Sequence, residues 1–328
     1  MTVSFFSASL ASWRAAYERH SYARPVDDAA QAVVRLSIKT SARARTAQSL
    51  GAEREGTGAV IAPDGLILTI GYLVLEAESI LVMTHDGRIY PAHVVGFDHA
   101  SGFGLIRTAP GVCRHNLELG DSDSVRELHM CTVAAHVASG GLSMAAIVGR
   151  RRFTGWWEYM IDDALFTAPP RYEHSGAALF DGEGRLVGIA SLWVSDALNA
   201  GVAFPGNMFV PINLLKEVLP DLVQSGRRHG RKRPWLGLNT EQMEGHVVVS
   251  RVLPDSPSEY AGLQRGDVIL GVGGDSIGGQ GEFYERLWES CAAGDDVTLH
   301  IVREKSVKHL IVQTGDRLDY LQPWRITP

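Results

Sequence analysis

The chain has 328 residues, which at roughly 150 residues per domain leaves room for about two domains, each with its own core. Its hydrophobic content of 45% and charged content of 21% are those of a globular protein, and 35 glycines indicate many turns and therefore strands. A net charge of -6 excludes a global attraction to nucleic acid or to an anionic membrane. The three cysteines are far apart in the sequence and form no CxxC pair, which excludes a disulfide framework and a zinc knuckle.

The first 30 residues form an N-terminal segment in which Leu10, Trp13, Ala16 and Tyr17 recur at helical spacing. This segment lacks the basic start of a signal peptide, and no run of about 18 apolar residues occurs anywhere in the chain. We therefore expect no membrane span and a cytoplasmic location, or a periplasmic one if the native N-terminus has been trimmed.

Residues 31–225 read as a series of short β-strands that are separated by turns such as PDG and HDG. The spacing predicts an all-β barrel or sandwich, with strands at 32–40, 58–62, 66–70, 79–84, 92–98, 128–137, 145–151, 178–180 and 186–194. Apolar residues at helical spacing then predict a helix from Pro211 to Gly226. The basic stretch 226–233 is predicted to be a linker whose charged side chains are solvated, rather than a nucleic-acid site.

Residues 234–316 form a second predicted unit, followed by a C-terminal tail at 317–328. Its strands are expected near 246–253, 267–273, 296–303 and 309–314, and its helical stretches near 256–263 and 281–291. WLGLN at 235–239 resembles the carboxylate-binding loop of a PDZ domain, and VLPDSPSEYAGLQRGDVILGVGG resembles the stretch that follows it. The resemblance implies an α+β domain of the kind appended to HtrA-type proteases.

A PDZ domain binds the C-terminal carboxylate of a peptide through backbone N–H groups and pairs the peptide with a strand edge. The expected peptide-binding residues are therefore Trp235, Leu236, Gly237 and Leu238. In the following helix, Phe283 with Leu287 and Tyr284 with Trp288 form two i,i+4 pairs, of which one lines the groove and the other faces the core, or all four belong to the core.

The first unit resembles the chymotrypsin-like double β-barrel of HtrA-type serine proteases. The residues that carry the resemblance are GTGAVIAPDGLILTIGYLV, GRIYPAHVVGFDHASGFGLIR, EHSGAALFDGEGRLVGI and FVPINLLKEVLPDLVQSG. The expected fold is mainly β: a chymotrypsin-like double barrel followed by a PDZ domain.

A serine protease needs a base beside its serine, a carboxylate that orients the base, and N–H donors for the oxyanion. By the resemblance Ser175 is the nucleophile, but Tyr72 stands at the position of the histidine and Gly102 at that of the aspartate. A phenol with a reference pKa near 10 is a poor base at neutral pH. Glu173 and His174 replace the Gly-Asn of the oxyanion loop, and either His99 or His174 would have to act as an unconventional base.

These departures predict an inactive HtrA-like pseudoprotease that binds C-terminal or unfolded peptide segments through its PDZ domain, as a scaffold, chaperone-like protein or regulatory subunit. The alternative is an active serine endopeptidase that uses Ser175 with a non-standard base. The resemblance also implies one of two kinds of assembly: a homo-oligomer, such as a trimer, or a complex with an active HtrA paralogue. No cofactor or metal is expected, because none of the histidines shows a ligand spacing.

Overall fold

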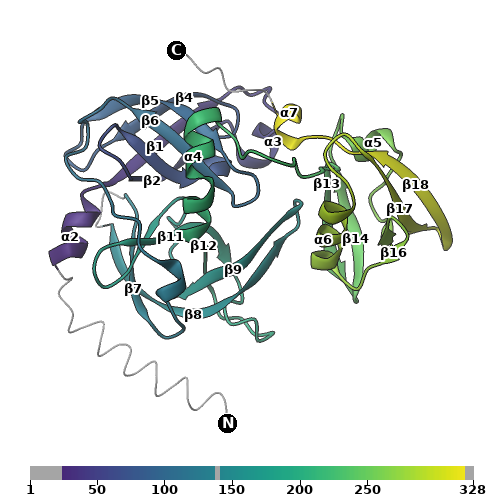
Figure 1. The fold of residues 1–328 in the computed structure, drawn as a ribbon. Coiled ribbons are helices and arrows are strands. Elements are labelled where there is room, and N and C mark those ends of the chain that lie inside the picture. The colour runs from purple at the N-terminus through teal and green to yellow at the C-terminus, as the bar shows by residue number, and fades with distance from the viewer. Residues whose placement is uncertain (1–23, 137–140, 322–328) are drawn as a thin grey trace, which may run out of the picture.

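Two barrels and a separate sheet account for the strands of this protein (Figure 1). The structure is a computed structural model that describes residues 24–136 and 141–321. The first barrel closes in the order β1-β2-β3-β6-β5-β4, with every neighbouring pair antiparallel. Its strands are β1 (Val33–Thr40), β2 (Glu53–Val60), β3 (Leu66–Ile70), β4 (Ala77–Met83), β5 (Ile89–Phe97) and β6 (Phe103–Thr108).

The second barrel closes in the order β10-β11-β12-β9-β8-β7 and is also antiparallel throughout. Its strands are β7 (Met130–Ala134), β8 (Leu142–Gly155), β9 (Tyr159–Ala168), β10 (Ala178–Phe180), β11 (Leu186–Val194) and β12 (Gly206–Pro211). Closure pairs every strand of a barrel on both edges, so neither barrel presents a free edge. Short helical elements accompany the barrels: α2 (Arg24–Ala30), α3 (Ala47–Leu50), η1 (Gly71–Leu73) and η2 (Ser122–Ser124).

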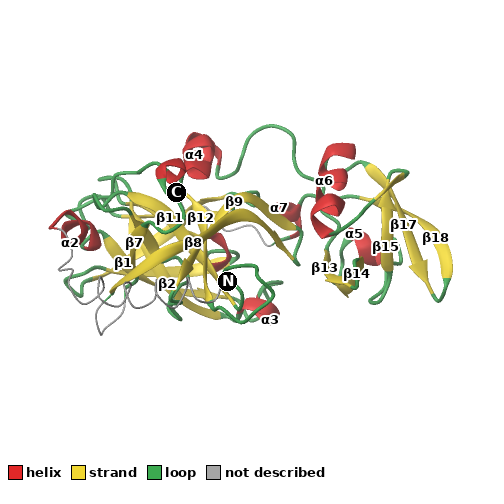
Figure 2. Ribbon diagram, turned by 90° about the horizontal axis from the view of Figure 1, so that it is seen from below, coloured by secondary structure: helices red, strands yellow, loops and turns green. Residues whose placement is uncertain are grey.

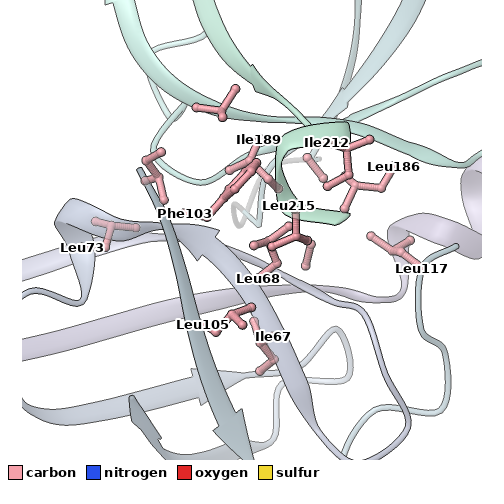
Figure 3. Packing of buried hydrophobic residues seen from close by; sticks show 14 of the residues in the cluster. Ile67, Leu68, Leu73, Phe103, Leu105, Leu117, Leu186, Ile189, Ile212 and Leu215 are labelled. Carbon is pink, nitrogen blue, oxygen red and sulfur yellow. The ribbon is translucent and has the colours of Figure 1, made fainter. Parts of the chain in front are cut away.

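One apolar cluster joins the two barrels (Figure 3). Ile67 and Leu68 of β3 are fully buried and belong to the same cluster as Ile189 of β11. All five residues of β3 are buried, because one face of this strand lines its own barrel and the other faces the second barrel. Burial of this contact fixes the relative position of the barrels, and with it the position of residues at their junction.

Helix α4 (Asn213–Ser225) follows the last strand of the second barrel and confirms the helix that apolar spacing predicts at 211–226. Leu215, Val218 and Leu222 are buried in the cluster that the barrels share. Gly226 ends the helix in the left-handed conformation, and its N–H donates to the carbonyl of Leu222. The helix therefore packs along both barrels, as Figures 1 and 2 show.

The third sheet follows the order β13-β14-β15-β17-β18, with β16 paired to β15. Its strands are β13 (Leu238–Met243), β14 (His246–Val252), β15 (Val268–Val272), β16 (Asp275–Ser276), β17 (Asp296–Arg303) and β18 (Ser306–Gln313). Two helices, α5 (Pro257–Tyr260) and α6 (Gln280–Ser290), accompany this sheet. Strand β13 is at the edge of the sheet, with a single neighbouring strand, β14.

Residues on both sides of the third sheet return to the barrels. Helix α7 (Arg317–Tyr320) follows the last strand, and Leu321 packs against Leu75 and Phe97 of the first barrel. In the stretch predicted to be a solvated linker, Arg228 pairs with the buried Asp98 at 2.9 Å. The stretch is therefore tied to the first barrel, although most of its residues are exposed. The helix predicted at 10–22 lies outside the described residues.

Candidate functional site

Ser175 lies on the turn that connects β9 to β10, at the junction of the two barrels. Its carbonyl accepts a hydrogen bond of 2.8 Å from the N–H of Thr57 in β2 of the first barrel. Gly176 follows with a φ of +76°, and a Cβ at this position would be 2.1 Å from the carbonyl oxygen of Thr57. Only glycine fits there, which fixes the course of the backbone at the serine.

Tyr72 is the side chain that contacts the serine hydroxyl. It lies on η1, directly after β3, and its Oη is 2.8 Å from Ser175 Oγ and 3.0 Å from the carbonyl oxygen of Ser191. The phenol is the donor in both contacts and has a single hydrogen, so it donates either to Ser175 Oγ or to the Ser191 carbonyl at one time. Burial raises the pKa of Tyr72 to about 12, which keeps the phenol protonated at neutral pH.

Gly102 provides no carboxylate to this site. It has a φ of +83°, its carbonyl accepts the N–H of Gly71 at 2.7 Å, and a Cβ would be 3.0 Å from the hydroxyl of Tyr159. The nearby carboxylate of Asp98 is directed elsewhere, because it accepts from Ser101 at 2.7 Å and from Arg228. The structure thus brings Tyr72 and Ser175 together and leaves Asp98 outside their contact.

Neither histidine that the sequence suggests as a base contacts Ser175. Both ring nitrogens of His99 are within 3.1 Å of Arg317 Nη1, on the side of the first barrel that faces α7. His174 Nδ1 is 2.9 Å from the carbonyl oxygen of Tyr172, in its own turn. Burial lowers the pKa of both imidazoles, so both are neutral at pH 7.

Ser175 opens onto a cavity of about 380 Å³, which also holds a histidine that sequence reasoning missed. His136 lines this cavity, its pKa is lowered by burial, and its Nδ1 finds no hydrogen-bond partner among the described residues. No sequence motif relates His136, which follows β7, to Ser175. The two residues meet at one cavity only in the folded chain. Glu173 is also on this wall, with an exposed carboxylate 3.9 Å from Arg171.

The loop at 235–239 does present backbone N–H groups, and a carboxylate of this chain already occupies them. Glu158 Oε1 accepts from the N–H of Leu236 at 2.8 Å, and Oε2 accepts from those of Gly237 and Leu238 at 2.9 and 3.3 Å. Gly237 has a φ of +78°, which turns the loop around the carboxylate. The side chains of Trp235, Leu236 and Leu238 are buried, so this loop offers its backbone rather than its side chains.

The four predicted groove residues on helix α6 differ in their burial and contacts. Phe283 and Leu287 are completely buried in the apolar cluster of the third sheet. Tyr284 is also buried, but its hydroxyl reaches the space beside β13, where it meets the Thr240 hydroxyl at 3.0 Å. Trp288 is half-buried and stacks on Tyr284 with ring centroids 5.5 Å apart. Phe283 and Leu287 thus lie in the core, whereas Tyr284, stacked on Trp288, presents its hydroxyl to the space beside β13.

The part of the chain that the structure describes contains no group of three histidine, cysteine, aspartate or glutamate side chains that could hold a metal ion. Within the same residues, no helix has the length and apolar character needed to cross a membrane.

Comparison with known proteins identifies both units. Residues 56–189 match the trypsin-like peptidase domain, and residues 234–314 match the PDZ domain. The serine endoprotease DegS of Haemophilus influenzae is 27% identical over 76% of this chain and 74% of its own length. A probable periplasmic serine endoprotease DegP-like of Marinomonas is 29% identical over 69% of this chain and 50% of its length, and serine protease HTRA1 of Xenopus tropicalis is 25% identical over 80% and 57%.

Solved structures show the same fold. The HtrA-type protease AlgW with a decapeptide superposes with a TM-score of 0.56 at 22% identity, over 93% of this chain and 99% of that one. A serine endoprotease from Yersinia pestis superposes with a TM-score of 0.54 at 23% identity, over 90% and 98%. The chain therefore carries a trypsin-like peptidase domain followed by a PDZ domain, in the fold of the HtrA-type structures, and the predicted mainly β fold is confirmed.

The comparisons correct two of the predictions. The prediction of a binding protein without proteolysis is wrong, because the relatives that match are named as serine endoproteases, in agreement with the alternative of an active enzyme. The cytoplasmic location is not supported either, since two relatives from bacteria are named as periplasmic. The chain spans only 50 to 57% of several longer relatives, so what those whole proteins do does not transfer directly.

Proposed function

We propose that this protein is a PDZ-containing serine endopeptidase in which Ser175 is the nucleophile and the Tyr72 hydroxyl stands at the position of the base. The observation that carries the proposal is the 2.8 Å contact between the two hydroxyl oxygens, made beside a cavity that leaves room for substrate. Tyr72 and Gly102 are then this chain's residues at the positions of the histidine and aspartate of the fold.

The reaction starts when Tyr72 is ionised. The phenolate accepts the proton of Ser175 Oγ, the oxygen attacks the peptide carbonyl, and the phenol then returns the proton to the leaving amine. The Ser191 carbonyl, 3.0 Å from the phenol oxygen, accepts the hydrogen of the neutral phenol, and this hydrogen bond is lost when Tyr72 ionises. With a pKa of about 12 for Tyr72, roughly one molecule in 10⁵ carries the phenolate at pH 7, so turnover is slow.

The PDZ domain supplies recognition in this proposal. Its ligands are C-terminal or unfolded peptide segments of other proteins, bound at the N–H groups of residues 236–238 and the edge of β13. Support for a periplasmic site of action and for a homo-oligomer comes from the likeness to HtrA-type proteases. We place the peptidase-fold domain at 31–225, the basic linker at 226–233, the PDZ domain at 234–316 and the tail at 317–328.

Hydrolysis of an unfolded protein substrate at a series of pH values tests this proposal. We expect the rate of the wild-type chain to rise about tenfold per pH unit between pH 7 and 10, because the phenolate fraction rises by that factor. Ser175→Ala removes the activity at every pH, and Tyr72→Phe removes the rise. Wild-type activity equal to that of Ser175→Ala would overturn the proposal.

His136→Gln is the matched control, because it changes a polar side chain on the same cavity without touching the contact between Tyr72 and Ser175. It is expected to leave the pH profile unchanged. A rate that reaches a plateau near pH 7 in wild type and is lost in His136→Gln contradicts the role of Tyr72 and assigns the proton transfer to an imidazole.

A further inference from the structure

The turn between β8 and β9 reaches from the second barrel into the PDZ domain (Figures 1 and 2). Strand β8 ends at Gly155 and β9 begins at Tyr159, so three residues form the turn. Met160, the second residue of β9, belongs to the apolar cluster of the PDZ domain. At the same face, Arg152 of β8 pairs with Glu285 of α6 at 2.6 Å. The hairpin is thus held against the PDZ domain on both of its strands.

The contacts of this turn are those that a bound C-terminal peptide makes. The Glu158 carboxylate accepts all three N–H groups of the carboxylate loop, and only 2% of the residue is exposed. Two residues earlier, the carbonyl of Trp156 accepts the N–H of Thr240 in the edge strand β13 at 2.9 Å. Carboxylate at the loop and main-chain pairing with the strand edge are the two elements of peptide recognition by β-augmentation.

Helix α6 completes the enclosure. The hydroxyl of Tyr284 donates to the carbonyl of Gly155 at 3.0 Å and accepts the N–H of Glu158 at 3.1 Å. The Gln280 amide reaches the carbonyl of Thr240 at 2.8 Å and that of Gly155 at 3.4 Å. The turn therefore lies between β13 and α6 and satisfies polar groups of both.

Glu158 has a backbone conformation that a free turn does not favour for this residue. Its φ of +56° is in the left-handed region, which glycine or asparagine adopts at this position of a three-residue hairpin loop. A non-glycine residue is retained in this conformation when its surroundings compensate for the strain. The surroundings here are the three N–H donors of the PDZ loop.

We infer that residues 155–158 are an internal ligand of the PDZ domain, with the Glu158 side chain in the place of a peptide C-terminus, so that an external peptide binds only by displacing this turn. The inference rests on the proposed function in that it takes the same groove to be the peptide site. A ligand on the same chain competes at a high effective concentration, and the apparent affinity for peptide falls by the fraction of molecules whose groove is free.

The first test measures the groove of the full-length chain without any peptide, by amide hydrogen exchange at Leu236, Gly237 and Leu238. Glu158→Ala is expected to raise exchange at these three amides by about tenfold or more, because their acceptor is removed. Asp162→Asn is the matched control: it removes a carboxylate from the same hairpin, and Asp162 is exposed and bonded only to Arg152. Unchanged exchange in Glu158→Ala, or the same change in Asp162→Asn, overturns the inference.

The second test measures peptide binding with a pool of fluorescein-labelled heptapeptides of random sequence that have free C-terminal carboxylates, and with the same pool amidated. Glu158→Ala is expected to bind the carboxylate pool at least about tenfold more tightly than wild type or Asp162→Asn, with no binding of the amidated pool. Equal affinity in wild type and Glu158→Ala contradicts the internal ligand. Increased amide exchange in Glu158→Ala with no binding of either pool supports the internal contact and overturns the proposed peptide-binding function.

Should Glu158→Ala fail to fold, Glu158→Gln keeps the shape of the side chain and removes its charge. It is expected to show the same direction of change in both measurements, by a smaller factor, because one amide oxygen accepts fewer of the three N–H groups. A Glu158→Gln chain that matches wild type in amide exchange and in peptide affinity overturns the inference.

Discussion

At the scale of single residues, the position of Ser175 depends on a glycine beside it. Gly176 has its φ at +76°, and the two nearest atoms to an added Cβ are the carbonyl oxygen of Thr57 at 2.1 Å and the hydroxyl of Thr69 at 2.6 Å. The first is backbone and cannot rotate away. The serine turn therefore holds its shape only with glycine at this position.

Gly176→Ala is predicted to lower the free energy of unfolding by about 2 kcal/mol or more, from left-handed strain and from the clash with Thr57. Gly182→Ala is the control, because a Cβ there meets open space. Urea denaturation of both variants measures the difference. A Gly176→Ala chain as stable as Gly182→Ala would show that the serine turn moves without cost.

At the scale of elements, α4 determines how the barrels are covered. Leu222 is completely buried in the last turns of the helix, whereas its neighbour Val223 is 40% exposed. The two residues have the same helical backbone and opposite surroundings. Comparing the same substitution at both positions therefore measures what burial of the apolar face contributes to the free energy of unfolding.

Leu222→Ala is predicted to cost about 2 to 5 kcal/mol of unfolding free energy, because it removes buried methyl groups and leaves a cavity. Val223→Ala is predicted to change stability by about 0.5 kcal/mol or less, as substitutions at exposed positions do. Thermal and urea unfolding of the two variants give both values. Similar losses in the two would mean that α4 does not rest on the barrels along the face described.

At the scale of the whole molecule, Glu158 links the stability of the chain to pH. Burial raises its pKa to about 7, although hydrogen bonds from Leu236, Gly237 and Leu238 and the charge of Arg317 act in the opposite direction. The Tyr284 hydroxyl of α6 accepts the backbone N–H of Glu158, and Arg317 in turn contacts the imidazole of His99. Its ordinary pKa is 4.5.

Between pH 4.5 and 7 the folded chain keeps the proton of Glu158 while the unfolded chain has lost it, so this residue makes stability fall as pH rises. Integrated over the window, the loss amounts to about 3 kcal/mol. Glu158→Gln is predicted to remove this slope, measured as the difference in unfolding free energy between wild type and variant at pH 4.5, 6 and 7.5. A difference that does not change with pH contradicts the shifted pKa.

Much of the fold followed from local patterns. Short β-rich runs with turn residues predicted many of the strands but not β6, β9, β12 or β13. Apolar spacing predicted α4, and the motifs around Ser175 and at 252–274 predicted the two domain types. The site was predicted in part: the sequence named Tyr72, Ser175 and the 235–238 loop. It did not find His136, Glu158 or the return of α7 to the first barrel, because no spacing in the chain relates these residues to their partners.

The sequence by itself determined which residues are available: the hydroxyls of Tyr72 and Ser175, the glycine at 102, and a loop of N–H donors at 236–238. Only the tertiary structure decided how they meet. It set the Tyr72 hydroxyl 2.8 Å from Ser175, and it brought Glu158 onto a loop that lies 78 residues further along the chain. Periodicity and motifs report interactions between near neighbours in the chain, whereas barrel closure and domain packing depend on burial of surfaces that are distant in sequence.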